Sequence, residues 1–281
     1  MNYMQILKKG ENYLKKNKIL NPHLDVELIL SKVLNRNREQ IILNLNKNLK
    51  NTDIMKFKHY LFRRYQNEPM AYILGYKYFW KHKFLTNKSV LIPRPDTELI
   101  IEETLKYLPN NNSKKILDIG TGSGCIVVSL IKERPKCAAT AIDISINAIK
   151  VAKTNAKLHQ LENKINFINI DIDKLKSYNY DLVISNPPYI NSIEFNRLGD
   201  DIKSHEPKIA LSGGSDGLKD LKKVIFKSKK LLKVNGKLIL EIGHKQKNIC
   251  TKILNENNFY INKSSKDLSG KDRCIVSTKL Q

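Results

Sequence analysis

The sequence predicts an α/β protein whose sheet is mostly parallel and covered by helices on both faces. Two observations predict this fold class. From Lys114 onward, short apolar runs typical of strands alternate with longer segments of helical periodicity. Glycine and polar residues fall where one kind of segment gives way to the next, as expected for βαβ units. Ligands bind beyond the carboxyl ends of the strands in such sheets, so a site is expected there.

The first part of the chain has a helical pattern only. Asn21-Pro22 is typical of a helix start, with Asn as the cap and Pro in the first turn. Thr52 is expected to cap a further helix, whose apolar residues recur on one face. The short connections between these segments predict a small α-helical bundle over residues 1–68.

The next segment changes character. Residues 71–75 and 76–80 are rich in aromatic and β-branched residues, and residues 83–86 are expected to return as a second strand. Two prolines then stiffen the chain. We therefore expect a β-hairpin linker over residues 69–95, which joins the bundle to a domain over residues 96–281.

That last domain contains the alternating pattern. Helices are expected from about residue 124, over residues 147–160 and over residues 215–233. The last two strands are expected to form a closing pair at the end of the chain. The expected strands are residues 115–119, 138–144, 165–171, 180–185, 237–242, 259–266 and 273–278.

The chain of 281 residues has a formal net charge of +23, which is strongly basic. Such a charge attracts nucleic acid or anionic membranes. However, 42 of the 50 basic residues are Lys, they are spread over the whole length, and Asn and Ile are also abundant. An A/T-rich genome also raises the content of Lys, Asn and Ile, without any selection for binding. The charge alone therefore assigns no partner, and no stable nucleic-acid binding is expected.

Several other classes of protein do not fit the sequence. No apolar run approaches the ~20 residues of a membrane helix, and the segment MNYMQILKKG lacks the apolar centre of a secretory signal. The cysteines match no zinc spacing, and the scattered histidines form no metal-binding motif. We expect a cytoplasmic protein with reduced thiols, no metal, no membrane association and a monomeric chain.

A glycine-rich loop follows the first strand of the last domain. The segment Asp118–Gly124 has the spacing G-x-G-x-G and lies where a strand ends and a helix begins. Glycines there allow a sharp turn and let a ligand approach the backbone. The dinucleotide fingerprint needs a glycine where Cys125 stands, which argues against NAD; a tight turn without a ligand is the alternative. The residues expected to contact a cofactor are Gly120, Thr121, Gly122, Ser123 and Gly124.

Acidic residues follow the next two strands. Asp143 can accept hydrogen bonds from both hydroxyls of a ribose. Asp171 can accept from an adenine amino group while Ile172 packs on the ring; the alternative for Asp171 is a helix cap or a loop carboxylate. A glycine loop, a ribose acceptor and an adenine site at successive strand ends are the arrangement that binds S-adenosyl-L-methionine.

The fourth strand leads directly into Asn186-Pro187-Pro188-Tyr189. An amide nitrogen is a poor nucleophile, so an enzyme that methylates it must align the nitrogen and accept its N–H hydrogens. The Asn186 side-chain carbonyl and the Pro187 backbone carbonyl can accept them, and Tyr189 offers a flat ring for a planar amide. We expect Asn186, Pro187 and Tyr189 to be catalytic, Pro188 to bind substrate with them, and Asn186 to touch the cofactor as well. A purely structural turn is the alternative.

Together these residues resemble the N-P-P-Y amino-methyltransferases and, among them, the release-factor glutamine methyltransferases of the HemK/PrmC type. The resemblance covers nearly the whole chain. Its further motifs are Glu68-Pro69, Ile73-Leu-Gly75, Leu91–Glu98, Glu206-Pro207, Ala210-Leu211, Gly213–Gly217, Glu241-Ile-Gly243 and Asp267–Arg273.

The resemblance implies a seven-stranded Rossmann-like methyltransferase sheet with an antiparallel last strand. It also implies S-adenosylmethionine-dependent methylation of the glutamine in the Gly-Gly-Gln motif of class I peptide-chain release factors, which the N-terminal bundle helps to recognise. Some relatives are expected to have an aromatic residue where Ile172 stands. This leaves only the stacking on adenine open.

Three interpretations stay open at this stage. The N-P-P-Y motif also occurs in nucleic-acid methyltransferases that act on adenine N6 or guanine N2, and a degenerate, non-enzymatic binding module is a further alternative. Asp96 or Thr97 caps the helix that begins near Glu98, or else lines the site. Glu206-Pro207 and Gly213-Gly214 form loops beside the site or simple turns.

Overall fold

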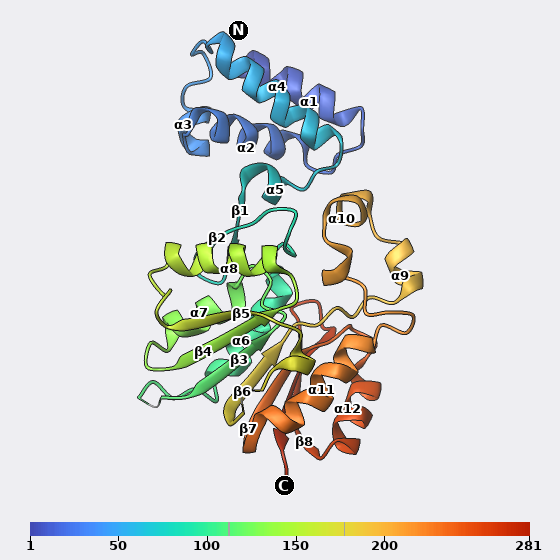
Figure 1. The fold of residues 1–281 in the computed structure, drawn as a ribbon. Coiled ribbons are helices and arrows are strands. Elements are labelled where there is room, and N and C mark those ends of the chain that lie inside the picture. The colour runs from blue at the N-terminus through green and yellow to red at the C-terminus, as the bar shows by residue number, and fades with distance from the viewer. Residues whose placement is uncertain (112, 177) are drawn as a thin grey trace. The chain divides into compact units, whose positions relative to one another are not determined.

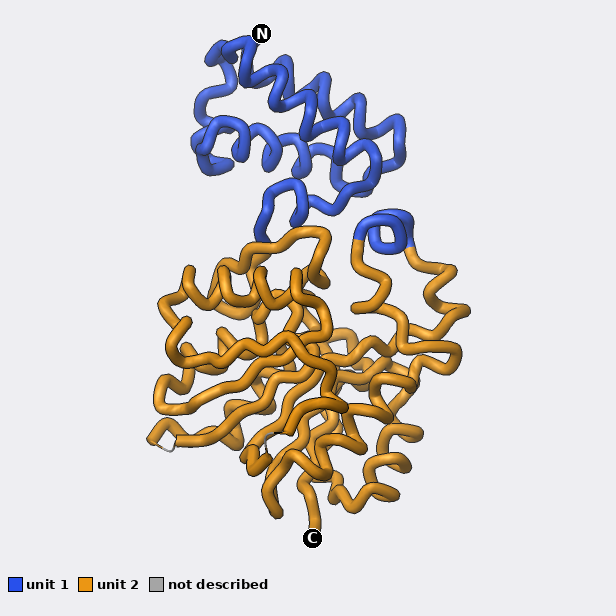
Figure 2. Tube along the Cα trace, in the orientation of Figure 1, with its two compact units in different colours: residues 1–76, 199–205 blue, residues 77–198, 206–281 orange. Residues whose placement is uncertain are grey.

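The chain folds into two compact units, which Figure 2 shows in different colours. Each unit has its own hydrophobic core. The first unit contains residues 1–76 and 199–205, and the second contains residues 77–198 and 206–281. The computed structural model describes residues 1–111, 113–176 and 178–281.

The first unit consists of helices, as the N-terminal pattern predicts. Leu14, Ile29 and Leu30 are fully buried at its centre. Gly10 allows the first helix to pack closely, because a Cβ atom there would lie 3.0 Å from Phe57 and from a neighbouring valine. The helices are α1 (Tyr3–Lys15), α2 (Pro22–Leu34), α3 (Arg38–Ile42), α4 (Asn51–Tyr65), α5 (Met70–Leu74) and α10 (Asp200–His205).

Of the two predicted helix caps, Asn21 is at the cap position of its helix and Thr52 is not. Asn21 makes no side-chain cap hydrogen bond, although the proline after it begins α2 as expected. Thr52 lies inside α4, which already begins at Asn51. The side-chain cap of α1 is Asn2, whose Oδ1 accepts from the Gln5 N–H at 2.9 Å. The sequence pattern therefore located the helices better than their first residues.

The predicted hairpin forms, but its first part is helical. Strands β1 (Tyr76–Phe79) and β2 (His82–Leu85) pair with each other. Residues 71–75, which were expected to be extended, fall in and just after α5, so that expectation is wrong. Pro69 precedes this helix, and Gly75 ends it with φ of 85°. The two residues thus bound a short helix that overrides the strand preference of the apolar side chains between them.

The second unit is built around the predicted seven-stranded sheet. The order of its strands is β5-β4-β3-β6-β7-β9-β8, and Figure 1 shows the strands from β5 to β7 side by side. β9 runs antiparallel to both of its neighbours. This confirms the fold class, including the antiparallel last strand. The strands are β3 (Lys115–Ile119), β4 (Ala138–Asp143), β5 (Ile165–Asn169), β6 (Tyr180–Ser185), β7 (Leu232–Glu241), β8 (Phe259–Lys266) and β9 (Asp272–Lys279).

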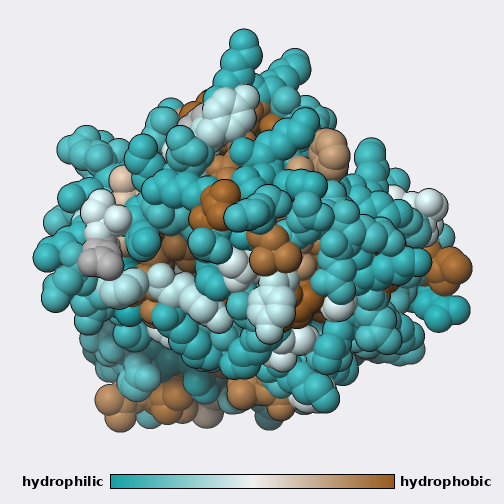
Figure 3. Space-filling view, turned by 90° about the horizontal axis from the view of Figure 1, so that it is seen from below, coloured by the Kyte–Doolittle hydropathy of each residue, from teal (hydrophilic) through white to brown (hydrophobic). Residues whose placement is uncertain are grey.

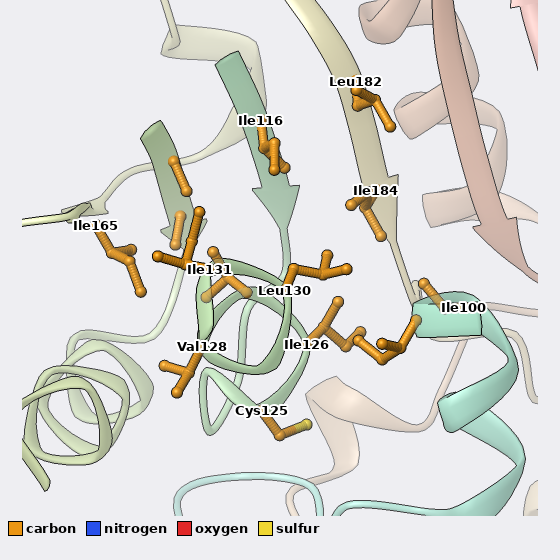
Figure 4. Packing of buried hydrophobic residues seen from close by; sticks show 14 of the residues in the cluster. Ile100, Ile116, Cys125, Ile126, Val128, Leu130, Ile131, Ile165, Leu182 and Ile184 are labelled. Carbon is orange, nitrogen blue, oxygen red and sulfur yellow. The ribbon is translucent and has the colours of Figure 1, made fainter. Parts of the chain in front are cut away.

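Helices cover both faces of this sheet. One core cluster joins α6, α7 and α8 to the sheet, and the other joins α11 and α12 to its opposite face. Figure 4 shows part of the first cluster, where Ile126 and Leu130 of α7 lie near Ile184 of β6. The helices and 3₁₀ turns are η1 (Pro95–Thr97), α6 (Glu98–Leu105), α7 (Cys125–Glu133), α8 (Ile146–Leu158), η2 (Ile172–Lys174), α9 (Ser192–Asn196), η3 (Lys208–Ala210), α11 (Lys219–Leu231) and α12 (Lys247–Glu256).

Two strand boundaries differ from the prediction by more than one residue. β5 ends at Asn169 instead of residue 171, because the chain turns into η2. β7 begins at Leu232, five residues before the expected start, and its register with β6 shifts near Leu182. Asn235 and Gly236 interrupt the apolar pattern there, so the early part of this strand could not be recognised from hydrophobicity.

The surface is largely hydrophilic on the face shown in Figure 3, where hydrophobic side chains form small groups between polar ones. This agrees with a chain in which 27% of the residues are charged. Within the described parts of the chain, no helix combines the length and the apolar character needed to cross a membrane.

Candidate active site

The glycine loop after β3 is held in shape by the end of β4. The Gly120 and Thr121 N–H groups both donate to the Ile142 carbonyl, at 2.9 and 3.0 Å. Gly120, Gly122 and Gly124 have φ of 73°, 56° and 79°, values that favour glycine. A Cβ atom on Gly120 would meet nothing within 4 Å, so the loop borders open space. The predicted turn is therefore a shaped backbone surface at the carboxyl end of the sheet.

A buried acid lies beneath this loop. Asp118 is 1% exposed and accepts a hydrogen bond from the Thr121 hydroxyl at 2.7 Å. Burial raises the pKa of its carboxyl group to about 7, and the nearby Asp143 carboxylate adds to the increase. Its other oxygen has no partner at ordinary hydrogen-bond geometry among the described residues. Sequence analysis placed Asp118 in the motif without giving it a role.

Asp143 lies beside the glycine loop, as predicted. Its Oδ2 accepts from the Gly122 N–H at 2.9 Å and its Oδ1 from the Ser145 N–H at 2.8 Å. Burial raises the pKa of this carboxyl group, while the backbone N–H groups of Ser145, Gly122 and Ile144 oppose the increase. A carboxylate has about four acceptor positions, so at least one remains open for a further hydrogen bond.

The acid of the predicted adenine site, Asp171, caps a 3₁₀ turn and forms an ion pair. The Asp171 Oδ1 caps η2 by accepting from the Asp173 N–H at 2.8 Å, and Lys223 Nζ lies 2.7 and 2.9 Å from the two oxygens. The Lys223 ammonium is the main reason that the pKa of Asp171 is lowered. Ile172 is 7% exposed and packs in the core with Ile142. The capping alternative is thus what the structure shows for Asp171, with one acceptor position still open on Oδ2.

The start of the tetrapeptide is tied to η1. The Ser185 hydroxyl, at the end of β6, donates to the Ile119 carbonyl at 2.8 Å. Asn186 Nδ2 then donates to Thr97 Oγ1 at 3.2 Å, which leaves the Asn186 carbonyl as an acceptor for another group. Thr97 makes no side-chain cap to α6. For Thr97, the site-lining interpretation is therefore the one that the structure supports.

The end of the tetrapeptide contacts a buried charge network. Tyr189 Oη donates to Glu241 Oε1 at 3.1 Å, and Arg273 Nη1 lies 3.5 Å from the same hydroxyl. Burial raises the pKa of the Tyr189 hydroxyl above its usual range, and it raises that of the Glu241 carboxyl to about 7. Arg273 also pairs with Asp96 at 3.4 Å and Asp267 at 3.1 Å. This network joins residues from η1, β7 and β9.

A loop after η3 supports the tetrapeptide backbone. Ile190 and Ser212 form a β-bridge, and Gln246 Nε2 donates to the Tyr189 carbonyl at 3.1 Å. A Cβ atom on Gly217 would lie 2.5 Å from the Tyr189 carbonyl oxygen. A Cβ atom on Gly213 would lie 2.6 Å from the Pro188 carbonyl oxygen. The loop that contains Gly213 and Gly217 therefore packs directly against the tetrapeptide.

Two further side chains connect segments of this unit. Glu206 is 5% exposed, accepts from the Ile92 N–H at 3.1 Å and pairs with Arg94. Asn155 of α8 is fully buried; its Nδ2 donates to the Leu85 carbonyl at 3.0 Å and to the Ser123 carbonyl at 2.8 Å. Asn155 thus joins β2 to the glycine loop.

Most of these supporting residues could not be recognised from the sequence. Glu241 and Arg273 were predicted only as parts of longer motifs. A signal was present for Glu241, because an acid that ends an apolar strand is buried and needs donors. Asn155 gave no signal, since it lies inside a predicted helix with nothing to mark its contacts.

Comparison with known proteins agrees with this architecture. A family model of the methyltransferase small domain matches residues 97–205, and one of the PrmC N-terminal domain matches residues 5–75. The structure resembles a methyltransferase from Pyrococcus furiosus with a TM-score of 0.53 and 17% identity, over 70% of this chain and 89% of that one. The fold and the glycine loop define a Rossmann-like methyltransferase.

The family follows from sequence similarity. The chain is 39% identical to the release factor glutamine methyltransferase of Fusobacterium nucleatum, over 98% of this chain and 78% of that protein. It belongs to the release factor glutamine methyltransferase family. It is also 35% identical to the bifunctional methyltransferase of Rickettsia felis, over 97% of this chain but only 57% of that protein. The chain thus spans little more than half the length of that relative.

Proposed function

We propose that this chain methylates the N5 side-chain amide of the glutamine in the Gly-Gly-Gln motif of class I peptide-chain release factors, using S-adenosyl-L-methionine. The observation that carries the proposal is the hydrogen bond from Asn186 Nδ2 to Thr97 Oγ1. It directs the amide nitrogen into the protein, so that Oδ1 is the atom available to a substrate N–H. Membership of the release factor glutamine methyltransferase family supports the same substrate.

The residues at the glycine loop fit this cofactor. Gly120–Gly124 would hold it against backbone N–H groups, and the open space at Gly120 provides room. Asp143 keeps an acceptor position for a ribose hydroxyl, and Asp171 keeps one on Oδ2 for the adenine amino group. Ile172 would contribute only the small part of its side chain that is exposed. When bound, S-adenosylmethionine supplies a methyl group on a sulfonium.

The tetrapeptide would hold the substrate amide. Asn186 Oδ1 and the Pro187 carbonyl accept its two N–H hydrogens, which aligns the nitrogen and concentrates electron density on it. Pro188 fixes the turn because its φ is restricted and it has no N–H. The Tyr189 ring packs against the planar amide, and its hydroxyl is fixed by Glu241. The nitrogen releases a proton as it gains the methyl group, and that proton passes to water.

We infer the remaining assignments from the same interpretation. The helical region over residues 1–68 recognises the release factor, residues 69–95 link it to the catalytic domain, and residues 96–281 carry catalysis. The protein acts as a monomer in the cytoplasm and is not expected to bind nucleic acid stably or to associate with a membrane.

The test is a methyl-transfer assay with the purified full chain and labelled S-adenosylmethionine. Release factor, the same factor with its motif glutamine changed to alanine, DNA and structured RNA are offered separately. We expect label only on the unaltered release factor, and mass spectrometry should place one methyl group on the motif glutamine. Labelling of DNA or RNA without labelling of the release factor would support an N-P-P-Y nucleic-acid methyltransferase instead.

A further inference from the structure

Glu241 is a buried acid that the proposed chemistry does not use directly. It ends β7, is 1% exposed, and accepts from Tyr189 Oη at 3.1 Å. The Thr97 hydroxyl lowers the pKa of this carboxyl group and so favours its charged form, although Tyr189 makes the one side-chain hydrogen bond of ordinary geometry to Glu241 among the described residues. Glu241 Oε2 has no partner at ordinary hydrogen-bond length among the described residues. The carboxylate therefore still has acceptor capacity, and hydroxyl groups are its donors.

The Thr97 hydroxyl connects this acid to Asn186. A hydroxyl group has one proton, and its oxygen can accept hydrogen bonds from other groups. When the Thr97 proton points to an ionised Glu241, the Thr97 oxygen can only accept from Asn186, as the distance of 3.2 Å to Nδ2 shows. The side-chain amide of Asn186 is then fixed with its nitrogen toward Thr97 and its carbonyl on the opposite side.

We propose that Glu241 is a positioning residue that, while ionised, orients the Asn186 amide through Thr97 so that its carbonyl faces the substrate nitrogen. A protonated Glu241 needs fewer donors, so the Thr97 proton is free to turn toward Asn186. The Asn186 amide can then turn over and present an NH2 group, which repels the substrate amide hydrogens. This inference rests on the proposed function, because it assigns a role within the same transfer reaction.

The charges around Glu241 place its ionisation in an accessible pH range. Burial raises the pKa of its carboxyl group to about 7, and the Arg273 guanidinium opposes the increase. Glu241 is therefore mainly protonated below about pH 7 and ionised above it, so methyl transfer should rise with pH through this range. The titratable and charged groups that face it are Asp96 of η1, Cys125 of α7, Tyr189 after β6, and Arg273 and Cys274 of β9.

The first test is the variant Glu241→Gln, assayed for transfer to release factor at saturating cofactor. The new amide can donate to Thr97 Oγ1, which frees the Thr97 proton to point at Asn186 at every pH. We expect kcat above pH 8 to fall by about tenfold or more and its rise between about pH 6 and about pH 8 to disappear. The calorimetric Kd for S-adenosylmethionine should stay within about twofold of the wild-type value, because the cofactor loop is untouched.

A second pair of variants keeps the inference testable if Glu241→Gln fails to fold. Thr97→Ser retains the hydroxyl, whereas Thr97→Val removes it with little change in volume. We expect the serine variant to keep both the pH profile and most of the activity. The valine variant should lose the pH-dependent rise together with about tenfold or more of kcat.

Glu103→Gln is the matched control. Glu103 is also buried, but its partners are Lys106, Lys263 and Ser265. This variant should keep the rise of kcat with pH, whatever its effect on melting temperature.

The outcomes separate this inference from the proposed function. A wild-type chain that methylates no release factor contradicts the proposed function. An active wild type whose Glu241→Gln and Thr97→Val variants keep the pH profile overturns only the role of Glu241. A parallel loss of melting temperature and activity with an unchanged profile also overturns it, since that pattern indicates a merely structural residue.

Discussion

The two halves of the site are constructed from different groups. At the glycine loop, backbone groups make most of the contacts: the Gly120 and Thr121 N–H groups bind the Ile142 carbonyl, and backbone N–H groups fix Asp143. At the tetrapeptide, side chains make them, as in the contacts of Asn186 with Thr97 and of Tyr189 with Glu241. The first half depends on the shape of the chain, and the second on the protonation and orientation of side chains.

This difference suggests how the two steps should respond to change. The backbone hydrogen bonds of the loop involve no side chain outside this region, so cofactor binding should tolerate most side-chain substitutions elsewhere. A side-chain network that includes a carboxyl group with a pKa of about 7 is sensitive to single substitutions and to pH. Substitutions at the tetrapeptide should therefore lower kcat with little effect on cofactor affinity, and the following experiments test that separation.

The largest effect is expected for Asn186→Ala. Removing the side-chain acceptor should lower kcat by roughly 100-fold or more, the range seen when one transition-state hydrogen bond is removed. The Kd for S-adenosylmethionine, measured by calorimetry, should change by less than about twofold. Asn166→Ala, on the exposed side of β5, is the matched control and should have wild-type kcat. A large loss of cofactor affinity in Asn186→Ala would break the separation.

The next effect concerns stability at the glycine loop. The folded-state pKa of Asp118 is raised from 3.8 to about 7, so between those values the folded protein holds a proton that the unfolded chain has lost. Its contribution to stability is therefore lost as the pH rises toward about 7. In Asp118→Asn this loss should not occur. The free energy of unfolding should therefore fall less between pH 5 and pH 8 than it does in the wild type, by roughly 2 kcal/mol. Equal differences in variant and wild type would contradict the assignment.

A smaller effect is expected from the loop that supports the tetrapeptide. In Gly217→Ala, the added Cβ atom would lie 2.5 Å from the Tyr189 carbonyl oxygen and must displace it. We expect kcat to fall by about tenfold while cofactor affinity is kept. Gly270→Ala is a close control, because Gly270 has φ of 76° but a Cβ atom there meets nothing within 4 Å. If both variants lose activity equally, backbone strain and not displacement is the cause.

The smallest effect is expected at the adenine side. Lys223→Met removes the ion pair with Asp171, a partly exposed pair of the kind that contributes about 1 kcal/mol or less. The freed carboxylate should bind the cofactor about two- to threefold more tightly. Lys227→Met removes a similar charge that pairs with Asp173 and not with Asp171, so it should leave Kd unchanged. No change in Kd for either variant would indicate that Asp171 does not contact the cofactor.

The sequence predicted the parts of the fold and site that depend on local pattern. The alternation of strands and helices indicated the sheet, and the glycine loop and tetrapeptide could be recognised because each is contiguous. The contacts between them could not be predicted, because Asn186 and Thr97 are 89 positions apart and Tyr189 and Glu241 are 52 apart. Such pairs are set by the register of packed elements, which hydrophobic periodicity does not determine.

The local errors have physical reasons too. Residues 71–75 have the side chains of a strand, yet Pro69 and Gly75 bound a short helix, and both signals were present in the sequence. At Asp171, the two interpretations were chemically equal until Lys223, 52 positions later, was placed beside the carboxylate. A lysine-rich chain offers too many ion partners for the right one to be chosen from composition.

Asn155 gives the second unit an internal coupling. Its one side-chain amide holds both β2, through Leu85, and the glycine loop, through the Ser123 carbonyl. Because the group is rigid and fully buried, a displacement of either strand or loop strains the hydrogen bonds of the other. The position of the hairpin and the shape of the glycine loop are therefore not independent of each other, since one buried side chain sets both.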